Sequence, residues 1–161
     1  MLTKFFHERD AMANTEALQL VLRDLFQTQR YAVLATDDCG QPFTSLMAFV
    51  ATQDMRQIII LTDRTTRKFA NLSANARVAL LIDDRENKDS DTQDSVAVTV
   101  IGQAREVDAV SGAALLALFL ARHPQLAEFS DSPNCAIIGV MVDSYRLVSS
   151  FQTVLEWRVG D

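Results

Sequence analysis

The chain has 161 residues and a mass of 17.9 kDa, with 48% hydrophobic and 22% charged residues. This size and composition predict a single domain over residues 1–161, with residues 1–13 as a flexible tail, and exclude a pair of full-sized domains. The 21 acidic and 15 basic side chains give a net charge of −6, which argues against a sequence-independent nucleic-acid binder and against a protein that binds anionic membranes.

In chain order, the first predicted element is a helix from a cap at Asn14 or Thr15 to about residue 30, because apolar residues recur at helical spacing over residues 18–26. YAVLAT (31–36) and FTSLMAFVAT (43–52) then predict two strands of a hairpin, joined by the Gly- and Pro-containing turn DDCGQP. QIIILT (57–62) predicts a strand buried on both faces.

The second half continues with a short helix that Thr65 or Thr66 can cap, and a strand over residues 78–82. Residues 83–94 carry six acids and two bases, −4 of the total charge, and predict a solvated loop. A long strand over 95–107, with Gly102 as a bulge, precedes a helix over 108–122. Residues 135–143 and 145–151 are two further strand candidates.

About six strands with short connections predict a mainly β (α+β) fold, a closed antiparallel barrel with flanking helices, and not a parallel sheet. The nucleotide-binding patterns GxGxxG and GxxxxGK are absent from the sequence. The longest apolar run, residues 113–121, is too short to span a bilayer. With no secretory signal pattern at the N-terminus, we expect a cytoplasmic protein without membrane partners.

Few residues suit side-chain catalysis or metal binding. Cys39 and Cys135 lack partners at metal-ligand spacing and predict two ordinary thiols. His7 and His123 are the only histidines, too few for a histidine-rich metal site. We therefore predict no metal ligands and no catalytic side chain.

The segment LTDRTTRK (61–68) is the strongest candidate for a binding site. A buried strand ends there, and a helix begins with hydroxyl groups and bases, giving three bases and one acid, a local charge of +2. The N–H groups of a helix N-terminus, the helix dipole and Arg and Lys side chains together favour a phosphate group. A solvated surface helix with simple threonine caps is the alternative.

The order AVLAT, GQPFTSLMAF, IIILTDRTTRKFANLSANARVALLID and VTVIGQAREV resembles the FMN-binding split-barrel family typified by pyridoxamine 5′-phosphate oxidase, over residues 30–107. The most specific part is the Arg-Lys, Asn-Leu, Asn and Arg-Val spacing between residues 62 and 80. The resemblance implies a six-stranded antiparallel split barrel, FMN as cofactor, and a homodimer with FMN at the interface.

The resemblance also implies cofactor-binding residues. Arg67 and Lys68 match the pair that holds the FMN phosphate, and Leu61 and Thr62 match the strand end that touches the phosphate and ribityl chain. The strand along the isoalloxazine ring is matched by Ser45, Leu46, Met47 and Ala48. From the residues alone, that strand is ordinary barrel core.

Other positions depart from the family or favour a structural role. Val50 and Ala97 stand where the oxidases carry a substrate-phosphate Lys and a Gln, so oxidation of pyridoxamine phosphate is not expected. Neither histidine lies in a motif that matches the haem-binding members. Asn71 and Asn75 are interpreted as helix-end and capping groups, and Trp157 as a packing anchor more than a flavin-stacking residue.

Three functions remain open from the sequence. The first is an FMN-dependent oxidoreductase acting on an unassigned small-molecule substrate or electron donor, with the flavin carrying the chemistry. The second is a non-catalytic flavin-binding protein for storage, sensing or stress. The third is a cofactor-free dimeric split barrel that serves as an interaction module.

Overall fold

The computed structural model describes residues 2–149 and 153–160, and the side chains among them except those of residues 2–14, 109 and 153. The helices are α1 (Leu2–Thr28), α2 (Arg67–Ala74), α3 (Asp91–Asp94), α4 (Ala109–Arg122) and α5 (Ala127–Ser130), with a 3₁₀ turn at Pro124–Leu126. The strands are β1 (Tyr31–Asp38), β2 (Gln41–Ala48), β3 (Val50–Ala51), β4 (Gln57–Asp63), β5 (Arg77–Asp83), β6 (Ala97–Glu106), β7 (Cys135–Ser149) and β8 (Thr153–Arg158).

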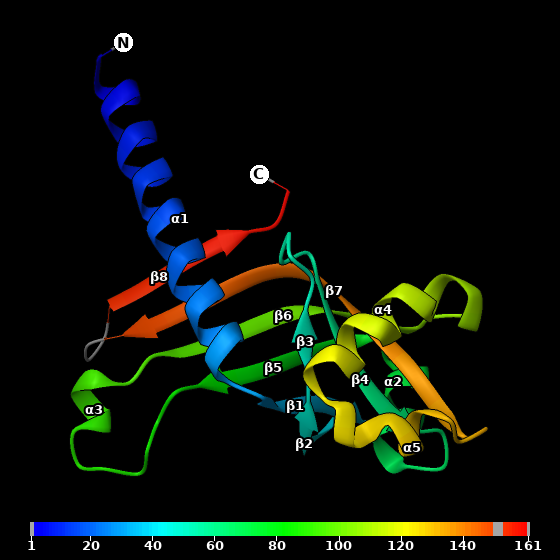
Figure 1. Cartoon of the computed structure of the whole chain (residues 1–161). Helices are drawn as coiled ribbons and strands as arrows, with labels where there is room; N and C mark the ends of the chain where they lie inside the picture. Colours follow the sequence, from blue (N-terminus) through cyan, green and yellow to red (C-terminus); the bar gives the residue numbers. More distant parts are fainter. Residues whose placement is uncertain (1, 150–152, 161) are drawn as a thin grey trace.

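The described strands form one eight-stranded sheet in the order β2-β1-β5-β6-β7-β4-β3, with β8 paired to β7. Neighbouring strands run antiparallel throughout. The two ends of this order, β2 and β3, are separated in the chain by Phe49 alone. The sheet must therefore curl to bring its ends together, which gives the half-barrel of Figure 1. The predicted mainly β, antiparallel class with flanking helices is confirmed.

Several predicted boundaries were wrong. Residues 135–143 and 145–149 form the single strand β7, and residues 150 and 151 of the second candidate lie outside the described part of the chain. The sheet has eight strands where about six were predicted. The first helix begins at Leu2, well before the predicted cap at Asn14 or Thr15. The acidic segment 83–94 ends in the short helix α3.

A predicted turn and a predicted bulge are confirmed. In the β1–β2 hairpin, Cys39 has φ +53° and Gly40 has φ +90°, the left-handed conformations that a tight two-residue turn requires. In β6, the pairing with β7 shifts register between Ile101 and Gly102. A Cβ atom at Gly102 would lie 2.3 Å from the carbonyl oxygen of Met141, so glycine lets the two strands approach at the bulge.

The main core lies inside the curl and is covered by α1. Leu18, Leu22 and Phe26 of α1 are buried in it. The Phe26 ring meets the Tyr145 ring at a centroid distance of 5.9 Å, and Tyr145 stacks on Trp157 at 5.5 Å. Trp157 is thus a packing residue in this chain, as its sequence position favoured.

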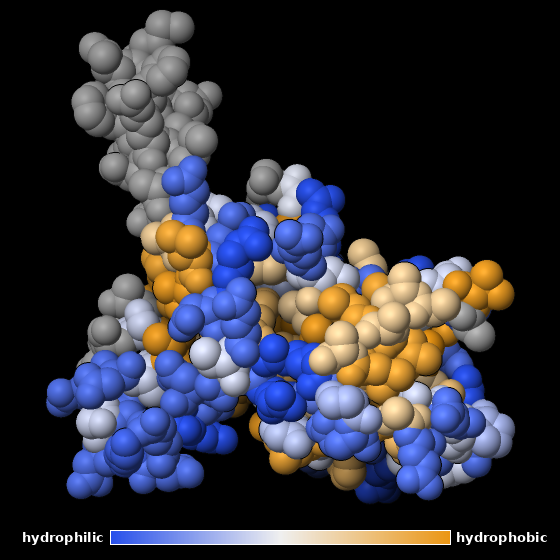
Figure 2. All heavy atoms as spheres, in the orientation of Figure 1, coloured by the Kyte–Doolittle hydropathy of each residue, from blue (hydrophilic) through white to orange (hydrophobic). Residues whose placement is uncertain are grey.

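A second apolar cluster lies under α4, on the part of the sheet formed by β3, β4 and β7. Phe119 of α4 is fully buried there against Val50, Ile59 and Leu61. The opposite side of α4 stays exposed, and Figure 2 shows apolar side chains gathered on this region of the surface. No described helix combines the length and the apolar composition that a bilayer-spanning helix requires.

Candidate functional site

The β4–α2 junction is built by a buried strand that stops at an aspartate. The Asp63 carboxylate accepts hydrogen bonds from the Thr65 hydroxyl (2.6 Å) and the Thr65 N–H (2.7 Å), which close the turn and lower the pKa of Asp63. Thr66 is the N-cap of α2, and its hydroxyl accepts a bond from the Phe69 N–H. Of the two predicted caps, Thr66 is confirmed, whereas Thr65 serves the turn before the helix.

The predicted phosphate-binding pair, Arg67 and Lys68, forms the first turn of α2. The backbone N–H groups of these two residues have no acceptor inside the helix because they belong to its first turn. The Arg67 Nε lies 3.1 Å from the Asp38 Oδ2, and the guanidinium lies over the Phe43 ring at 5.5 Å from its centroid. Lys68 is half-buried and has no ion pair within the described residues.

The charge of this junction is lower than the sequence count of +2. Arg64 points away from the helix start, toward β6, where it binds the Glu106 carboxylate at 2.5 Å and the Pro133 carbonyl at 2.9 Å. Arg67 is paired with Asp38 across a separation of 29 positions, which no local count can include. Lys68 is therefore the base of this segment whose charge is least compensated.

The predicted residues of β4 lie directly behind this turn. Leu61 and Thr62 are 5% and 2% exposed, so their side chains belong to the protein interior. The Thr62 hydroxyl lies 3.2 Å from that of Thr66. Thr62 thus supports the cap of α2, and any contact that Leu61 makes to a ligand must come from its backbone.

Three successive residues of β1 fasten α2 to the hairpin. Asn71 donates to the Thr36 hydroxyl at 3.0 Å, and the Asn75 amide donates to the Asp37 carboxylate at 3.1 Å. The Arg67–Asp38 pair is the third contact of this kind. Arg67, Asn71 and Asn75 are spaced four positions apart, so they lie on one face of α2. Asn75 is the C-cap, as predicted. Asn71 is not an end group but a buried tether, which its four-residue spacing to Asn75 could have signalled.

The predicted ring-binding residues lie on β2, an end strand of the described sheet. Met47 is 7% exposed and belongs to the main core, whereas Leu46 is 71% exposed. Ala48 packs against the cluster that contains Leu61. Ser45 is half-buried and pairs with Leu34 of β1. The structure thus brings β2, the end of β4 and the start of α2 into one region.

The histidines and cysteines are the residues that metal binding or redox chemistry would use, and the structure places the side chains of His123, Cys39 and Cys135. His123 is fully buried, its Nε2 lies 2.8 Å from the Phe49 carbonyl oxygen, and its ring lies 4.8 Å from that of Phe119. The described side chains contain no group of three or more His, Cys, Asp or Glu residues suited to a metal ion. The side chain of His7 lies outside the described part. Cys39 is an exposed free thiol, and burial raises the pKa of the free thiol of Cys135.

The positions that depart from the family pattern are also placed. Val50 is 8% exposed and packs with Ile59, Leu61 and Phe119 beneath α4. Ala97 is half-buried at the start of β6. Neither supplies a polar group for a substrate.

A sequence model of the family described as pyridoxamine 5′-phosphate oxidase matches residues 18–149. This match extends well beyond the 30–107 segment on which the resemblance rested, and it includes α4 and all of β7. No curated protein sequence matches the chain significantly.

Solved structures share the fold at low sequence identity. General Stress Protein 26 from Bacillus anthracis is 21% identical with a TM-score of 0.70, covering 88% of this chain and 98% of that one. A FAD-binding protein from Mesorhizobium loti is 13% identical with a TM-score of 0.64, covering 80% and 91%. A heme binding protein from Mycobacterium smegmatis is 17% identical with a TM-score of 0.73, covering 82% and 54%. At these identities the likeness establishes the fold alone.

Proposed function

Because the chain belongs to the pyridoxamine 5′-phosphate oxidase family, we propose that it binds FMN and works as a flavin-dependent oxidoreductase on a small-molecule substrate or electron donor. The observation that carries the proposal is the first turn of α2, where Arg67 and Lys68 follow a buried strand. When bound, the flavin would supply the hydride or electron transfer, and the protein would supply binding and orientation.

The residues at this turn fit a phosphate group. Lys68 offers an ammonium group without an ion-pair partner among the described residues, beside two free helix N–H groups. Asp38 engages the Nε of Arg67 and leaves the two Nη groups of the guanidinium for an anion. Arg67 and Lys68 would therefore hold the FMN phosphate, with Thr62 and Leu61 beside its ribityl end.

The flavin ring fits the edge of β2. In an antiparallel pair, alternate residues direct their N–H and C=O groups away from the partner strand. Because β2 ends the described sheet, those groups of the segment containing Ser45, Leu46, Met47 and Ala48 can bind the pyrimidine edge of the ring. The exposed Leu46 side chain would supply apolar contact.

FMN suits the chain better than FAD or heme, the cofactors that two solved proteins of similar fold bind. The start of α2, with the two bases Arg67 and Lys68, can hold one phosphate group. FAD, which a protein of similar fold binds, is a dinucleotide with two phosphate groups. A heme would need an axial ligand, and His123 is fully buried with its Nε2 engaged by the Phe49 carbonyl. FMN therefore remains our proposed cofactor.

Pyridoxamine phosphate is not our proposed substrate. An anionic substrate phosphate gains from a charged partner, and the residue that matches the family's lysine is Val50, packed beneath α4. Ala97 likewise offers no side-chain hydrogen bond. The substrate of the flavin site is therefore a different small molecule.

We further propose a homodimer with FMN at its interface, located in the cytoplasm. Tyr31 at the start of β1 is 53% exposed, and Leu46 on the adjacent β2 is 71% exposed. Exposed apolar groups on an end of the sheet favour coverage by another copy of the chain. The cofactor pocket would then close only in the dimer.

Flavin retention tests the cofactor proposal directly. The double variant Arg67→Ala/Lys68→Ala should bind FMN about 100-fold more weakly, because each base contributes a charge-assisted hydrogen bond. The measurement is the quenching of FMN fluorescence on titration with the full-length protein. Riboflavin, which lacks the phosphate, should bind both proteins with similar affinity.

The matched control is Arg85→Ala/Lys88→Ala, which removes two bases from the acidic segment 83–94 and makes the same change in net charge. It should bind FMN as the parent does. Equal affinity of the Arg67/Lys68 variant and the parent would show that the phosphate is held elsewhere. Absence of FMN binding by the parent would leave the cofactor-free module as the function.

Turnover separates an oxidoreductase from a flavin-storage protein. We expect anaerobic addition of a reduced nicotinamide or reduced deazaflavin to bleach the absorbance of bound FMN within the time of a mixing experiment. A bound flavin that neither donor bleaches would favour storage or sensing over catalysis.

A further inference from the structure

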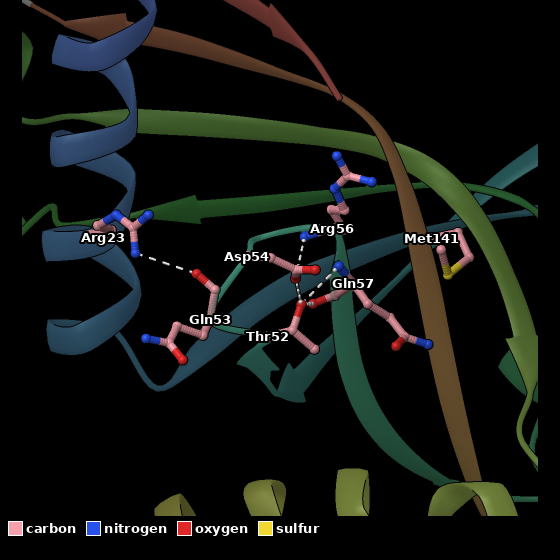
Figure 3. A pocket seen from close by; sticks show the side chains of 7 residues that line it. All are labelled: Arg23, Thr52, Gln53, Asp54, Arg56, Gln57 and Met141. Carbon is pink, nitrogen blue, oxygen red and sulfur yellow. Dashed lines mark hydrogen bonds between the residues drawn. The ribbon is translucent and has the colours of Figure 1, made fainter. Parts of the chain in front are cut away.

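A hollow of about 600 Å³ lies between α1, the β3–β4 turn and β7, away from the α2 site (Figure 3). Its volume falls within the usual range of small-molecule sites. The turn containing Asp54 precedes β4, whereas Arg67 and Lys68 follow its end, and a strand of this length separates the two places by about 20 Å. We call this space the arginine hollow. It is lined by Arg23, Thr52, Gln53, Asp54, Arg56, Gln57 and Met141.

The turn that forms one wall is held in one conformation by its own hydrogen bonds. Thr52 donates its N–H to the Gln57 carbonyl at 2.9 Å, and its hydroxyl lies 2.6 Å from the Asp54 carboxylate. Met55 has φ +57°, and its carbonyl accepts a 2.6 Å bond from the buried Tyr145 hydroxyl. The backbone between β3 and β4 is therefore fixed before any ligand arrives, as a binding site requires.

The charges around the arginine hollow do not balance. Arg23 donates to the Gln53 carbonyl at 3.3 Å and forms no ion pair with a described residue. Arg56 forms none either, although its charge acts on Asp54. The Asp54 carboxylate is engaged by the Thr52 hydroxyl and the Arg56 N–H, which lower its pKa. Two guanidinium groups and one engaged carboxylate thus border the hollow, in a protein whose overall charge is −6.

A smaller space of about 190 Å³ adjoins the hollow and shares Arg23, Thr52 and Gln53 with it. Arg122, at the end of α4, lines this space. Its Nη2 donates to the Gln27 and Gln29 carbonyls, but its Nε is buried and has no hydrogen-bond partner among the described residues. A buried donor without an acceptor is rare. Arg122 thus places a third guanidinium group beside the adjoining space.

We propose that the arginine hollow binds a small organic anion, whose carboxylate or phosphate group is held by the positive charge of Arg23 and Arg56 at its rim. The side-chain amides of Gln53 and Gln57 offer neutral hydrogen bonds, and Met141 offers an apolar wall. The site is separate from the α2 turn and does not depend on flavin binding.

The test uses phenyl phosphate as the probe, with benzyl alcohol as its neutral counterpart, on the isotope-labelled full-length protein. We expect phenyl phosphate to shift the amide NMR signals of Gln53, Asp54 and Arg56, and benzyl alcohol to leave them unchanged. The variant Arg23→Gln/Arg56→Gln should weaken phenyl phosphate binding by about tenfold or more, because two charge-assisted contacts are lost. Both arginines are exposed, so the substitutions leave the core intact.

The control is Arg85→Gln/Lys88→Gln, which lowers the net charge equally at the acidic segment and should bind the probe as the parent does. Equal affinity in the Arg23/Arg56 variant would overturn the proposal, as would an equal loss in the control. Shifts confined to Arg67 and Lys68 would place the anion at the flavin-phosphate turn and likewise overturn it. Riboflavin and FMN titrations on the same samples report the flavin site separately.

Discussion

At the scale of single residues, the β3–β4 turn depends on one hydroxyl group far away in the sequence. Tyr145 is fully buried, and burial raises the pKa of its phenol, so the hydroxyl stays protonated and continues to donate to the Met55 carbonyl. That carbonyl belongs to a residue with positive φ, an unfavourable conformation for methionine. The Tyr145 bond therefore stabilises the turn that forms the arginine hollow.

Removing this hydroxyl should destabilise the fold measurably. We expect Tyr145→Phe to lower the free energy of unfolding by about 1–3 kcal/mol, because the Met55 carbonyl would be left buried without a donor. Urea unfolding followed by circular dichroism measures the change. Thr92→Val in the acidic segment removes an exposed hydroxyl and should stay within about 0.5 kcal/mol of the parent. Equal stability of both variants would show that water replaces the donor at Met55.

At the scale of elements, the C-terminal ends of α1 and α4 are joined by hydrogen bonds. Arg122, the last residue of α4, donates to carbonyls at the end of α1, at Gln27 (2.9 Å) and Gln29 (2.6 Å). Arg30, just after α1, donates to the Arg122 carbonyl at 3.2 Å. Cations at helix C-termini satisfy free carbonyls and complement the helix dipole. This exchange fixes α1 relative to α4 beside the arginine hollow.

The bulge in β6 offers a sharp test at the same scale. Gly102→Ala should cost about 1–3 kcal/mol of unfolding free energy, because the new Cβ would meet the Met141 carbonyl oxygen, a backbone atom that cannot move alone. Gly112→Ala in α4 should be neutral or stabilising, since its closest neighbour, at 3.0 Å, is the flexible tip of Ile137 and alanine favours helix. Thermal unfolding compares the two. A Gly102→Ala protein as stable as the parent would mean that β6 and β7 separate without cost.

At the scale of the whole molecule, the curled sheet sets the two proposed sites apart. The α2 turn lies after the end of β4, beside the β1–β2 hairpin, while the arginine hollow lies before its start, beside α1. The exposed end of the sheet at β2 adjoins the first of these places. Assembly with a second copy would thus affect the flavin site more than the hollow.

This arrangement predicts a linked loss of assembly and flavin binding. We expect Leu46→Lys to shift the protein from dimer to monomer in size-exclusion chromatography with light scattering, and to weaken FMN binding at the same time. Val154→Lys places the same charge at a residue of β8 with 61% exposure and should do neither. A Leu46→Lys protein that stays dimeric would place the interface elsewhere.

Sequence patterns predicted the features that depend on near neighbours: the tight β1–β2 turn, the Thr66 cap and the buried strand that leads to Arg67 and Lys68. These depend on backbone geometry and burial within a few residues, which residue type and spacing encode. The pairing of Arg64 with Glu106 and of Arg67 with Asp38 could not be read this way, because partners 42 and 29 positions apart meet only once the strands are ordered. The same holds for Arg23, Arg56 and Arg122. They line the arginine hollow and the smaller space next to it only because the sheet curls and α1 and α4 pack against it. The sequence determined which segment is a candidate for phosphate binding, and the tertiary structure decided which of its charges are already paired.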